Sequence, residues 1–178
     1  ESNIPQTAKR IDFILSGYGE KRSRSAVIIE LKQWEKVNPV EGNDALVETY
    51  IGSGLRKVVH PSYQAWSYCA LLEDYNANVQ DRNIKLVPCA YLHNYKKDRN
   101  DAIEHPIYKD YLKKAPVFAH GDIGKLRAFI KRFIKQGDNR ENLYLIEKGQ
   151  IRPSKSLQDA LTGMLQGNRE FIMIDEQK

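Results

Sequence analysis

Two apolar segments near the N-terminus have the residue pattern of β-strands. RIDFILS at 10–16 alternates before it turns apolar, and SAVIIEL at 25–31 is β-branched and apolar. The polar, glycine-bearing stretch GYGEKRSR between them predicts an antiparallel hairpin with a long basic tip. Because the second segment is apolar on both faces, we expect it to lie centrally in its sheet.

The next part of the chain is first irregular, then helical, then extended. Glycines and a proline within 35–59 predict a long loop with one short strand near 47–51. Apolar residues at helical spacing over 61–78 predict a helix whose first residue is a proline. IKLVPCAYL at 84–92 predicts another apolar strand.

The C-terminal half is predicted to contain short helices and two short strands. We expect helices near 107–113, 123–134, 140–148 and after Ser156, and strands at 116–119 and 170–174. The 123–134 helix has the clearest apolar stripe, and Gly137 is expected to end it. Ser156 is expected to cap the last helix, which would turn these side chains inward: Leu157, Ala160, Leu161, Met164 and Leu165. The element order predicts an α/β domain with a mixed sheet.

Composition sets limits on the class of protein. A chain of 178 residues, with 41% hydrophobic and 29% charged residues, suits one domain with a small appendage. No apolar run is long enough for a membrane span and no signal-peptide pattern occurs, so we expect a cytoplasmic protein without membrane contacts. A net charge of +5 is mild for a nucleic-acid binder and decides nothing alone.

The cysteines and histidines do not follow metal-ligand spacings. Cys69 and Cys89 stand among apolar residues and tyrosines, which is typical of buried, reduced thiols in a cytosolic protein. The spacing leaves a structural disulfide between them open. The four histidines are scattered and do not predict a zinc site.

Two charged residues occur at the end of the second apolar strand. Glu30 and Lys32 are two positions apart in VIIELKQW, so both side chains point to one face. Charges on such a strand are costly unless they are paired or liganded. A simple alternative is that the strand ends at Leu31 and that Lys32 is merely solvated, since an isolated Glu-x-Lys is common.

Asp12 changes this interpretation, because hairpin pairing can bring it beside Glu30. Two neighbouring carboxylates repel unless a cation lies between them, and Mg²⁺ or Mn²⁺ takes oxygen ligands of this kind. The Leu31 carbonyl could supply a further oxygen. Lys32 would then orient the attacking water and offset charge on the phosphorane, while the cation polarises the phosphoryl oxygen.

Further candidates for the site lie after the irregular segment. Gln64 and Tyr68 share one helix face at i and i+4, where the glutamine could position water or phosphate. The alternative is a surface glutamine above a core tyrosine. The predicted nucleic-acid contacts are Arg10, Arg56, Lys57 and His60. For the Arg56–Lys57 pair, an ordinary solvated surface is an equally good interpretation.

At RIDFIL, VIIELKQW and HPSYQAWSY the sequence resembles the PD-(D/E)xK nuclease superfamily, in its RecB-like branch with a Q-x-x-x-Y motif. The resemblance implies a restriction-endonuclease-like core, in which helices flank a central mixed β-sheet. It also implies a catalytic set of Asp12, Glu30 and Lys32, with Gln64 and Tyr68 as the accessory motif. This sequence departs from the pattern by having Ile11 where proline often precedes the aspartate.

A broader resemblance covers nearly the whole chain. GSGLRKVVHPSYQAWSY, PCAYLHNY, KAPVF and IRPSKSLQDAL are similar to the N-terminal nuclease region of bacterial nuclease–helicase proteins with a Schlafen-group-3-type helicase part. This likeness implies a nuclease core over 1–120 and a helical extension over 121–178 that packs on the core and leads into a superfamily 1 helicase. It also implies a role in DNA processing or phage defence.

Two points about this assignment stay open at the level of sequence. Many family members carry an acidic residue on a helix before the first core strand, but only Glu1 precedes Asp12 here, so we expect this sequence to be a piece of a longer protein that lacks the helix. Whether Glu1 or a missing upstream residue completes the site stays open. The expected activity is metal-dependent hydrolysis of DNA. The alternatives are a catalytically silent, nuclease-like module for DNA binding or helicase docking, and a ribonuclease.

Overall fold

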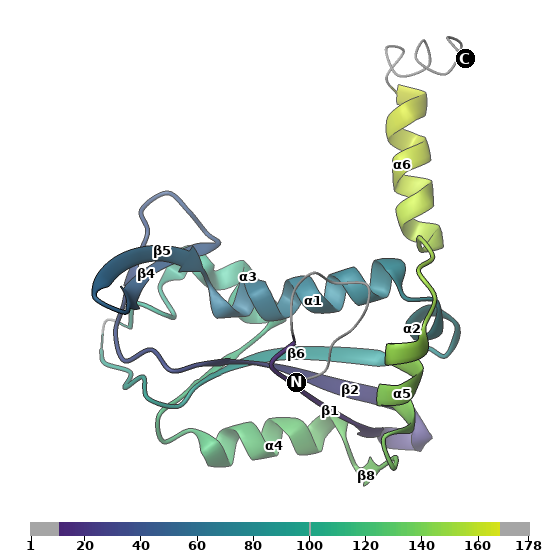
Figure 1. The fold of residues 1–178 in the computed structure, drawn as a ribbon, viewed down its shortest axis with the longest axis horizontal. Helices are drawn as coiled ribbons and strands as arrows, with labels where there is room; N and C mark the ends of the chain where they lie inside the picture. Colours follow the sequence, from purple (N-terminus) through teal and green to yellow (C-terminus); the bar gives the residue numbers. More distant parts are fainter. Residues whose placement is uncertain (1–10, 100, 168–178) are drawn as a thin grey trace.

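The computed structural model describes residues 11–99 and 101–167, and Figure 1 shows helices on both sides of a central sheet. The strands are β1 Phe13–Tyr18, β2 Arg24–Lys32, β3 Val37–Pro39, β4 Leu46–Ile51, β5 Gly54–Val59, β6 Lys85–Leu92, β7 Val117–Ala119 and β8 Gln136–Gly137. The helices are α1 Pro61–Tyr75, α2 Ala77–Asp81, α3 Lys109–Lys114, α4 Ile123–Phe133, α5 Glu141–Lys148 and α6 Lys155–Gly167, with 3₁₀ turns at Glu20–Arg22 and Pro106–Tyr108. This is the predicted α/β class.

The main sheet has five strands in the order β7-β6-β2-β1-β8. β1 is antiparallel to both β2 and β8, whereas β6 is parallel to both β2 and β7. The sheet is therefore mixed, as predicted. β2 lies at its centre because its residues are apolar towards both faces, and this prediction is also confirmed.

The β1–β2 hairpin is confirmed with a register that runs from Phe13 opposite Ile29 to Tyr18 opposite Arg24. Its basic tip contains Lys21 and Arg22, and both adopt positive φ in the tight turn. The hairpin sets the position of everything at the start of β1 relative to the end of β2.

The two faces of β2 have different covers (Figure 1). Ala26 and Ile28 pack into the cluster that contains Tyr68 and Leu72 of α1. Val27 belongs to the opposite cluster, which is completed by α4. Side chains alternate along a strand, so even-numbered residues of β2 face α1 and odd-numbered ones face α4.

Helix α1 begins where it was predicted but ends earlier. Pro61 occupies the first turn, and the side chain of His60 caps the helix. The Asn76 side chain accepts from the backbone N–H of Val79 at 3.1 Å and donates to the Ile146 carbonyl at 2.8 Å. Asn76 therefore caps a separate helix, α2, and divides the single helix expected over 61–78 into two.

The irregular segment 35–59 is more ordered than predicted. It forms a three-stranded antiparallel sheet, β3-β4-β5, rather than a loop with one strand. β4 is the predicted strand, and it connects to β5 through a tight turn in which Gly52 adopts a φ of 63°. β5 was missed because three consecutive residues of it are exposed and none is buried, so GLRKVV lacks the alternation of a half-buried strand.

The segment 121–148 closes onto the main sheet. α4 and α5 form at the predicted places, and α5 contacts β1 and β2. α4 ends before Ile134, however, and Gly137 lies in β8, where it pairs with Gly17 of β1. The prediction that Gly137 ends the helix is therefore wrong.

Helix α6 differs most from the prediction. Ser154, not Ser156, caps it, by accepting from the backbone N–H of Leu157 at 3.2 Å. The helix extends away from the sheet (Figure 1), and Leu161, Met164 and Leu165 are 50%, 70% and 48% exposed. The expected inward packing is wrong for these residues. The strand predicted at 170–174 lies outside the described residues.

Two further expectations concern the state of the cysteines and the presence of a membrane-spanning helix. Cys69 and Cys89 are both buried free thiols, so the alternative of a disulfide does not hold. Among the described helices, none is long and apolar enough to cross a membrane.

Candidate active site

Three charged side chains lie together where β1 begins and β2 ends. One further step of the β1–β2 register sets Asp12 across from Glu30. Asp12 Oδ2 accepts a hydrogen bond of 3.0 Å from the backbone N–H of Leu31. Lys32 Nζ lies 3.0 Å from Glu30 Oε1. The hairpin therefore brings the predicted catalytic trio into one place.

Glu30 is a buried carboxyl group on the face that α1 covers. Its side chain is only 2% exposed, whereas that of Lys32 is 21% exposed. Burial raises the pKa of Glu30 to about 7, which the neighbouring carboxylate of Asp12 favours and the ammonium of Lys32 opposes. Near neutral pH, Glu30 is therefore divided between its protonated and ionised forms.

The second oxygen of Glu30 is buried without a hydrogen-bond partner in the described part of the chain. Oε1 pairs with Lys32, but none of the described residues donates a hydrogen bond to the buried Oε2. Leaving a buried carboxylate oxygen without a donor is costly, so such an atom calls for an explanation. A cation ligated by this oxygen would satisfy it.

Tyr68 of α1 lies near the same carboxylates, and Gln64 is hydrogen-bonded to it. Gln64 Nε2 donates to the Tyr68 hydroxyl at 2.8 Å, and the tyrosine is 2% exposed. Burial raises the pKa of Tyr68, and the negative charges of Glu30 and Asp12 raise it further. The structure thus joins the Q-x-x-x-Y pair to the trio. Tyr68 is also a core residue, and Gln64 is half-buried rather than free on the surface.

The donor set suits a hard divalent cation with few protein ligands. Asp12 and Glu30 supply carboxylate oxygens, which Mg²⁺ and Mn²⁺ prefer over nitrogen and sulfur. Among residues 11–99 and 101–167, no group of three or more His, Cys, Asp or Glu side chains gathers as a ready-made metal cage. A two-carboxylate site of this kind fits Mg²⁺, which keeps waters and substrate phosphate as its other ligands. The Leu31 carbonyl stays a predicted ligand.

The predicted nucleic-acid contacts are not all close to this trio. Arg56 and Lys57 are exposed on β5, in the small sheet rather than in the sheet that carries Glu30. Their exposed position is compatible with a phosphate contact and equally with an ordinary solvated surface. Arg10 lies outside the described residues.

His60 is placed differently from the nucleic-acid contact that was predicted for it. The ring is fully buried, with Nε2 donating to the Ile103 carbonyl at 2.8 Å and Nδ1 accepting from the backbone N–H of Ser62 at 3.0 Å. Burial lowers the pKa of His60 to about 4, so it is neutral at physiological pH. With no exposed surface and no charge, it acts as a helix cap instead of a phosphate contact.

A groove beside Asp12 was not anticipated from the sequence. This cavity of about 450 Å³ runs from Asp12 along β1 to the turn before α5, where Asn139 and Arg140 line it. Both of these residues adopt positive φ, and Asp138 accepts from the backbone N–H of Arg140 at 3.0 Å. Arg140 thereby joins the lining of a cavity that Asp12 also lines. No local spacing signals this, because the turn is far from Asp12 in sequence.

Comparison of the chain with family models, curated proteins and solved structures gave no match. The fold defines an α/β protein with a five-stranded mixed sheet, a small antiparallel sheet and helices packed on the main sheet. Its functional interpretation therefore depends on the residues of the site themselves.

Proposed function

We propose that this protein is a metal-dependent nuclease that hydrolyses phosphodiester bonds in DNA. The observation that carries the proposal is Glu30, a buried carboxyl group with one oxygen on Lys32 and the other without a donor among the residues that the structure describes. A purely structural ion pair between Glu30 and Lys32 gains nothing from Asp12, a second carboxylate that raises the pKa of Glu30. A metal site gains from the second carboxylate, because the cation takes oxygen ligands from both.

Asp12 and Glu30 would hold the Mg²⁺ or Mn²⁺ ion. When bound, the ion polarises a phosphoryl oxygen and lowers the pKa of a water nucleophile. The backbone N–H of Leu31 donates to Asp12 Oδ2 and so holds the carboxylate in one orientation. The other oxygen, Oδ1, is then available as a ligand. Glu30 has to be ionised to act as a ligand, so binding of the cation displaces its proton.

Lys32 is proposed to act on the reacting phosphate. Its ammonium group is held between Glu30 Oε1 and the ring of Trp34, whose centroid is 5.2 Å from Nζ. Unlike Glu30, the side chain reaches solvent, where a substrate could approach it. A cation at this position offsets the negative charge that develops on the phosphoryl group and orients the attacking water.

Gln64 and Tyr68 are proposed as positioning residues. The amide of Gln64 fixes the Tyr68 hydroxyl by a 2.8 Å hydrogen bond, and the hydroxyl is close enough to the two carboxylates for their charges to raise its pKa. We propose that the fixed hydroxyl helps to orient these carboxylates. It supports the geometry of the site without requiring either residue to transfer a proton.

We also propose that β1, β2, α1 and β6 form a restriction-endonuclease-like core. The three motifs RIDFIL, VIIELKQW and HPSYQAWSY belong to the β1 region, β2 and α1, and their functional side chains converge. On the same resemblance, the natural partner is a helicase part of the same longer protein, with a role in DNA processing or phage defence. Those last two assignments rest on the sequence likeness.

The test is a cleavage assay with and without Mn²⁺ on single-stranded, duplex and branched DNA, and on RNA. We expect Glu30→Gln and Lys32→Ala to lower metal-dependent cleavage of DNA by at least about a hundredfold, as expected for loss of a catalytic group. Glu41→Gln and Lys131→Ala are matched controls, because both side chains are exposed and lie outside the site. Cleavage by both site variants at the wild-type rate would show that the assignment is wrong.

Two outcomes would redirect the proposal. Calorimetric titration with Mn²⁺ that detects no binding dependent on Asp12 and Glu30 would favour a silent, nuclease-like binding module. Cleavage of RNA instead of DNA would keep the catalytic set and replace the substrate.

A further inference from the structure

A basic groove lies at the β7 edge of the main sheet. It has a volume of about 630 Å³ and is formed by the end of α3, by β7 and by one face of α4. Its charged and aromatic lining residues are Lys113, Lys114, Lys125, Arg132, Phe118, Phe129 and Phe133. α4 packs on the sheet face opposite to α1, whereas Glu30 faces α1. The groove is therefore separate from the candidate active site.

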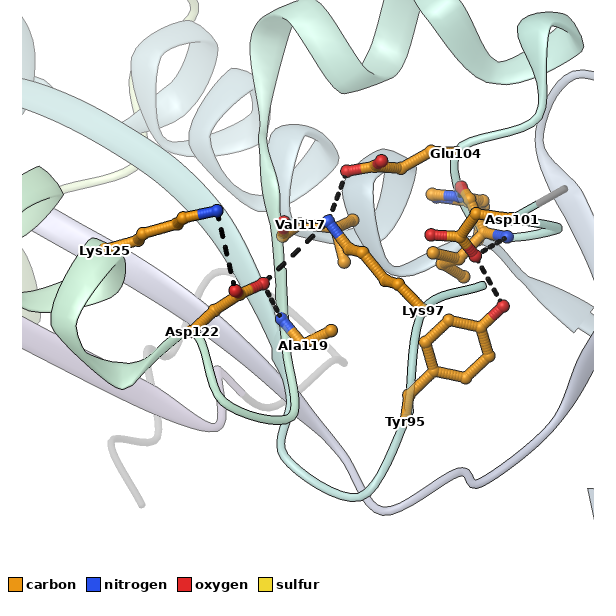
Figure 2. A network of polar contacts seen from close by, with 10 residues as sticks. Tyr95, Lys97, Asp101, Glu104, Val117, Ala119, Asp122 and Lys125 are labelled. Atoms are coloured by element: carbon orange, nitrogen blue, oxygen red, sulfur yellow. Dashed lines mark hydrogen bonds and ion pairs between the residues drawn. The ribbon is translucent and has the colours of Figure 1, made fainter. Parts of the chain in front are cut away.

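The charge in this groove has one sign. Among the described residues that line it, every charged one is a lysine or an arginine. Lys125 is 80% exposed, and its ion pair with Asp122 is long, at 3.9 Å (Figure 2). Asp122 is itself shared with Lys97, at 3.9 Å, so it neutralises little of the groove. This arrangement fits a polyanion.

Aromatic rings form the floor between these cations. The ring of Phe129 lies 5.4 Å from that of Phe118 and 5.1 Å from that of Phe133. All three rings are partly exposed, and the guanidinium of Arg132 lies 5.3 Å from the ring of Phe133. Lys125 and Arg132 are seven positions apart on α4, with Phe129 between them on the same face. The groove thus alternates cations with flat apolar surfaces.

We propose that this basic groove binds single-stranded DNA. Its cations would contact backbone phosphates and its phenylalanines would stack with bases, which is the usual combination in single-strand binding. Duplex DNA would use only the cations, since its bases are stacked inside the helix. Partly exposed rings beside the cations therefore favour the single strand.

The groove would hold the DNA outside the catalytic centre. Binding in the groove is independent of metal and of Glu30, but its use in cleavage rests on the proposed nuclease function. It would retain a substrate strand whose scissile phosphate reaches Asp12 and Glu30 on the other side of the sheet.

The test is the fluorescence anisotropy of a labelled oligothymidylate of about 12 nucleotides, a length within the usual single-strand site size, measured in EDTA. We expect Lys125→Ala/Arg132→Ala to weaken binding by roughly tenfold and to lower the salt slope by about 1.4, which corresponds to two lost phosphate contacts. Arg127→Ala/Lys131→Ala is the matched control, because both residues are exposed on α4 outside the groove. It should change the affinity little.

The proposal fails if the two double variants weaken binding equally, since general surface charge would then explain it. It also fails if duplex DNA of the same length binds as tightly as the single strand. A second variant, Lys113→Ala on α3, should also weaken binding, and this would show that the loss is not a local effect of the changes on α4.

Cleavage of a small phosphodiester, bis(p-nitrophenyl) phosphate, with Mn²⁺ separates this proposal from the nuclease assignment. The groove variant should keep this activity and lose cleavage of the long strand, whereas Glu30→Gln should keep oligothymidylate binding. A different result is that the wild-type protein cleaves neither substrate while the groove variant still binds oligothymidylate more weakly than wild type. In that case only the nuclease assignment is wrong.

Discussion

At the scale of single residues, two opposing effects act on the ionisation of Glu30. The apolar strand and α1 remove it from water, which favours the neutral acid, whereas Lys32 favours the ion. The balance leaves its pKa at about 7, compared with 4.5 for an unperturbed glutamate. Folding therefore makes Glu30 a stronger base, and the stability of the protein has to depend on its ionisation.

We expect this residue to give the folded protein a specific pH dependence without metal. The raised pKa contributes stability that is fully present below pH 4.5 and is lost as pH rises through about 7. The size of the pKa shift makes this loss about 3 kcal/mol. Urea unfolding in EDTA should therefore show wild type losing stability relative to Glu30→Gln as pH rises across this window.

His60 titrates in the opposite direction, because its lowered pKa contributes stability that is lost as pH falls from 6.5 to about 4. It is common to wild type and Glu30→Gln, so it cancels in their difference. Glu41→Gln, an exposed control, should follow wild type at every pH. Parallel curves for wild type and Glu30→Gln would contradict the prediction.

The residues of the site differ in how far the sequence predicts them. Asp12, Glu30 and Lys32 stand out because charges interrupt strongly apolar strands, and a period of two puts Glu30 and Lys32 on one face. Arg140 gives no such signal, since only tertiary folding brings its positive-φ turn to the groove beside Asp12. His60 was misplaced because its sequence position beside Pro61 does not reveal whether the ring faces the solvent or the core.

At the scale of elements, α4 and α6 have similar apolar patterns and different surroundings. Both sequences have an amphipathic stripe, yet α4 buries Leu126 against the sheet while α6 leaves Met164 70% exposed. Periodicity predicts which side of a helix is apolar but not whether anything covers it. This is why the place of α4 was predicted but the packing of α6 was not.

Shortening one apolar side chain to alanine on each of these two helices should therefore change the free energy of unfolding by unequal amounts. Leu126→Ala removes a side chain that is 5% exposed, and we expect it to lower the free energy of unfolding by about 2–5 kcal/mol. Met164→Ala removes an exposed side chain and should change it by less than about 0.5 kcal/mol. Urea denaturation of both variants checks this. A large loss with Met164→Ala would mean that α6 is covered in solution.

The small sheet shows a related limit of prediction at this scale. β4 was predicted because Val47 lies in an apolar, β-branched stretch and is buried in the second core cluster. β5 has exposed residues on both faces, so only its backbone pairing with β4 makes it a strand. Pairing of this kind cannot be seen in a pattern of side chains.

At the scale of the whole molecule, α4, β8 and α5 are part of the core, although all three lie after residue 120. α4 completes the cluster around Val27 and Ile29, and β8 adds a strand to the main sheet next to β1. α5 places Asn142 so that its side chain donates to the Gly17 carbonyl at 2.9 Å. The parts that were expected to be a core and an extension thus share one sheet.

We therefore expect a chain that ends at residue 120 not to fold cooperatively. Loss of α4 would expose one face of β2, including Val27 and Ile29, to water. A truncated chain of this kind should lack a sigmoidal urea transition by circular dichroism, whereas residues 1–178 should have one. A cooperative transition of similar midpoint for the short chain would show that the first 120 residues are autonomous.

The two kinds of strand pairing on β2 also suggest an order of folding events. Phe13 of β1 pairs with Ile29 of β2, and only a short loop connects the two strands. Ser25 of β2 pairs with Lys85 of β6, but the small sheet and α1 lie between them in the sequence. Short loops close at a lower entropic cost, so the β1–β2 hairpin should form before β6 docks. Asp12 and Glu30 would then come together while water still screens their repulsion, and the desolvation of Glu30 would fall late on the folding pathway.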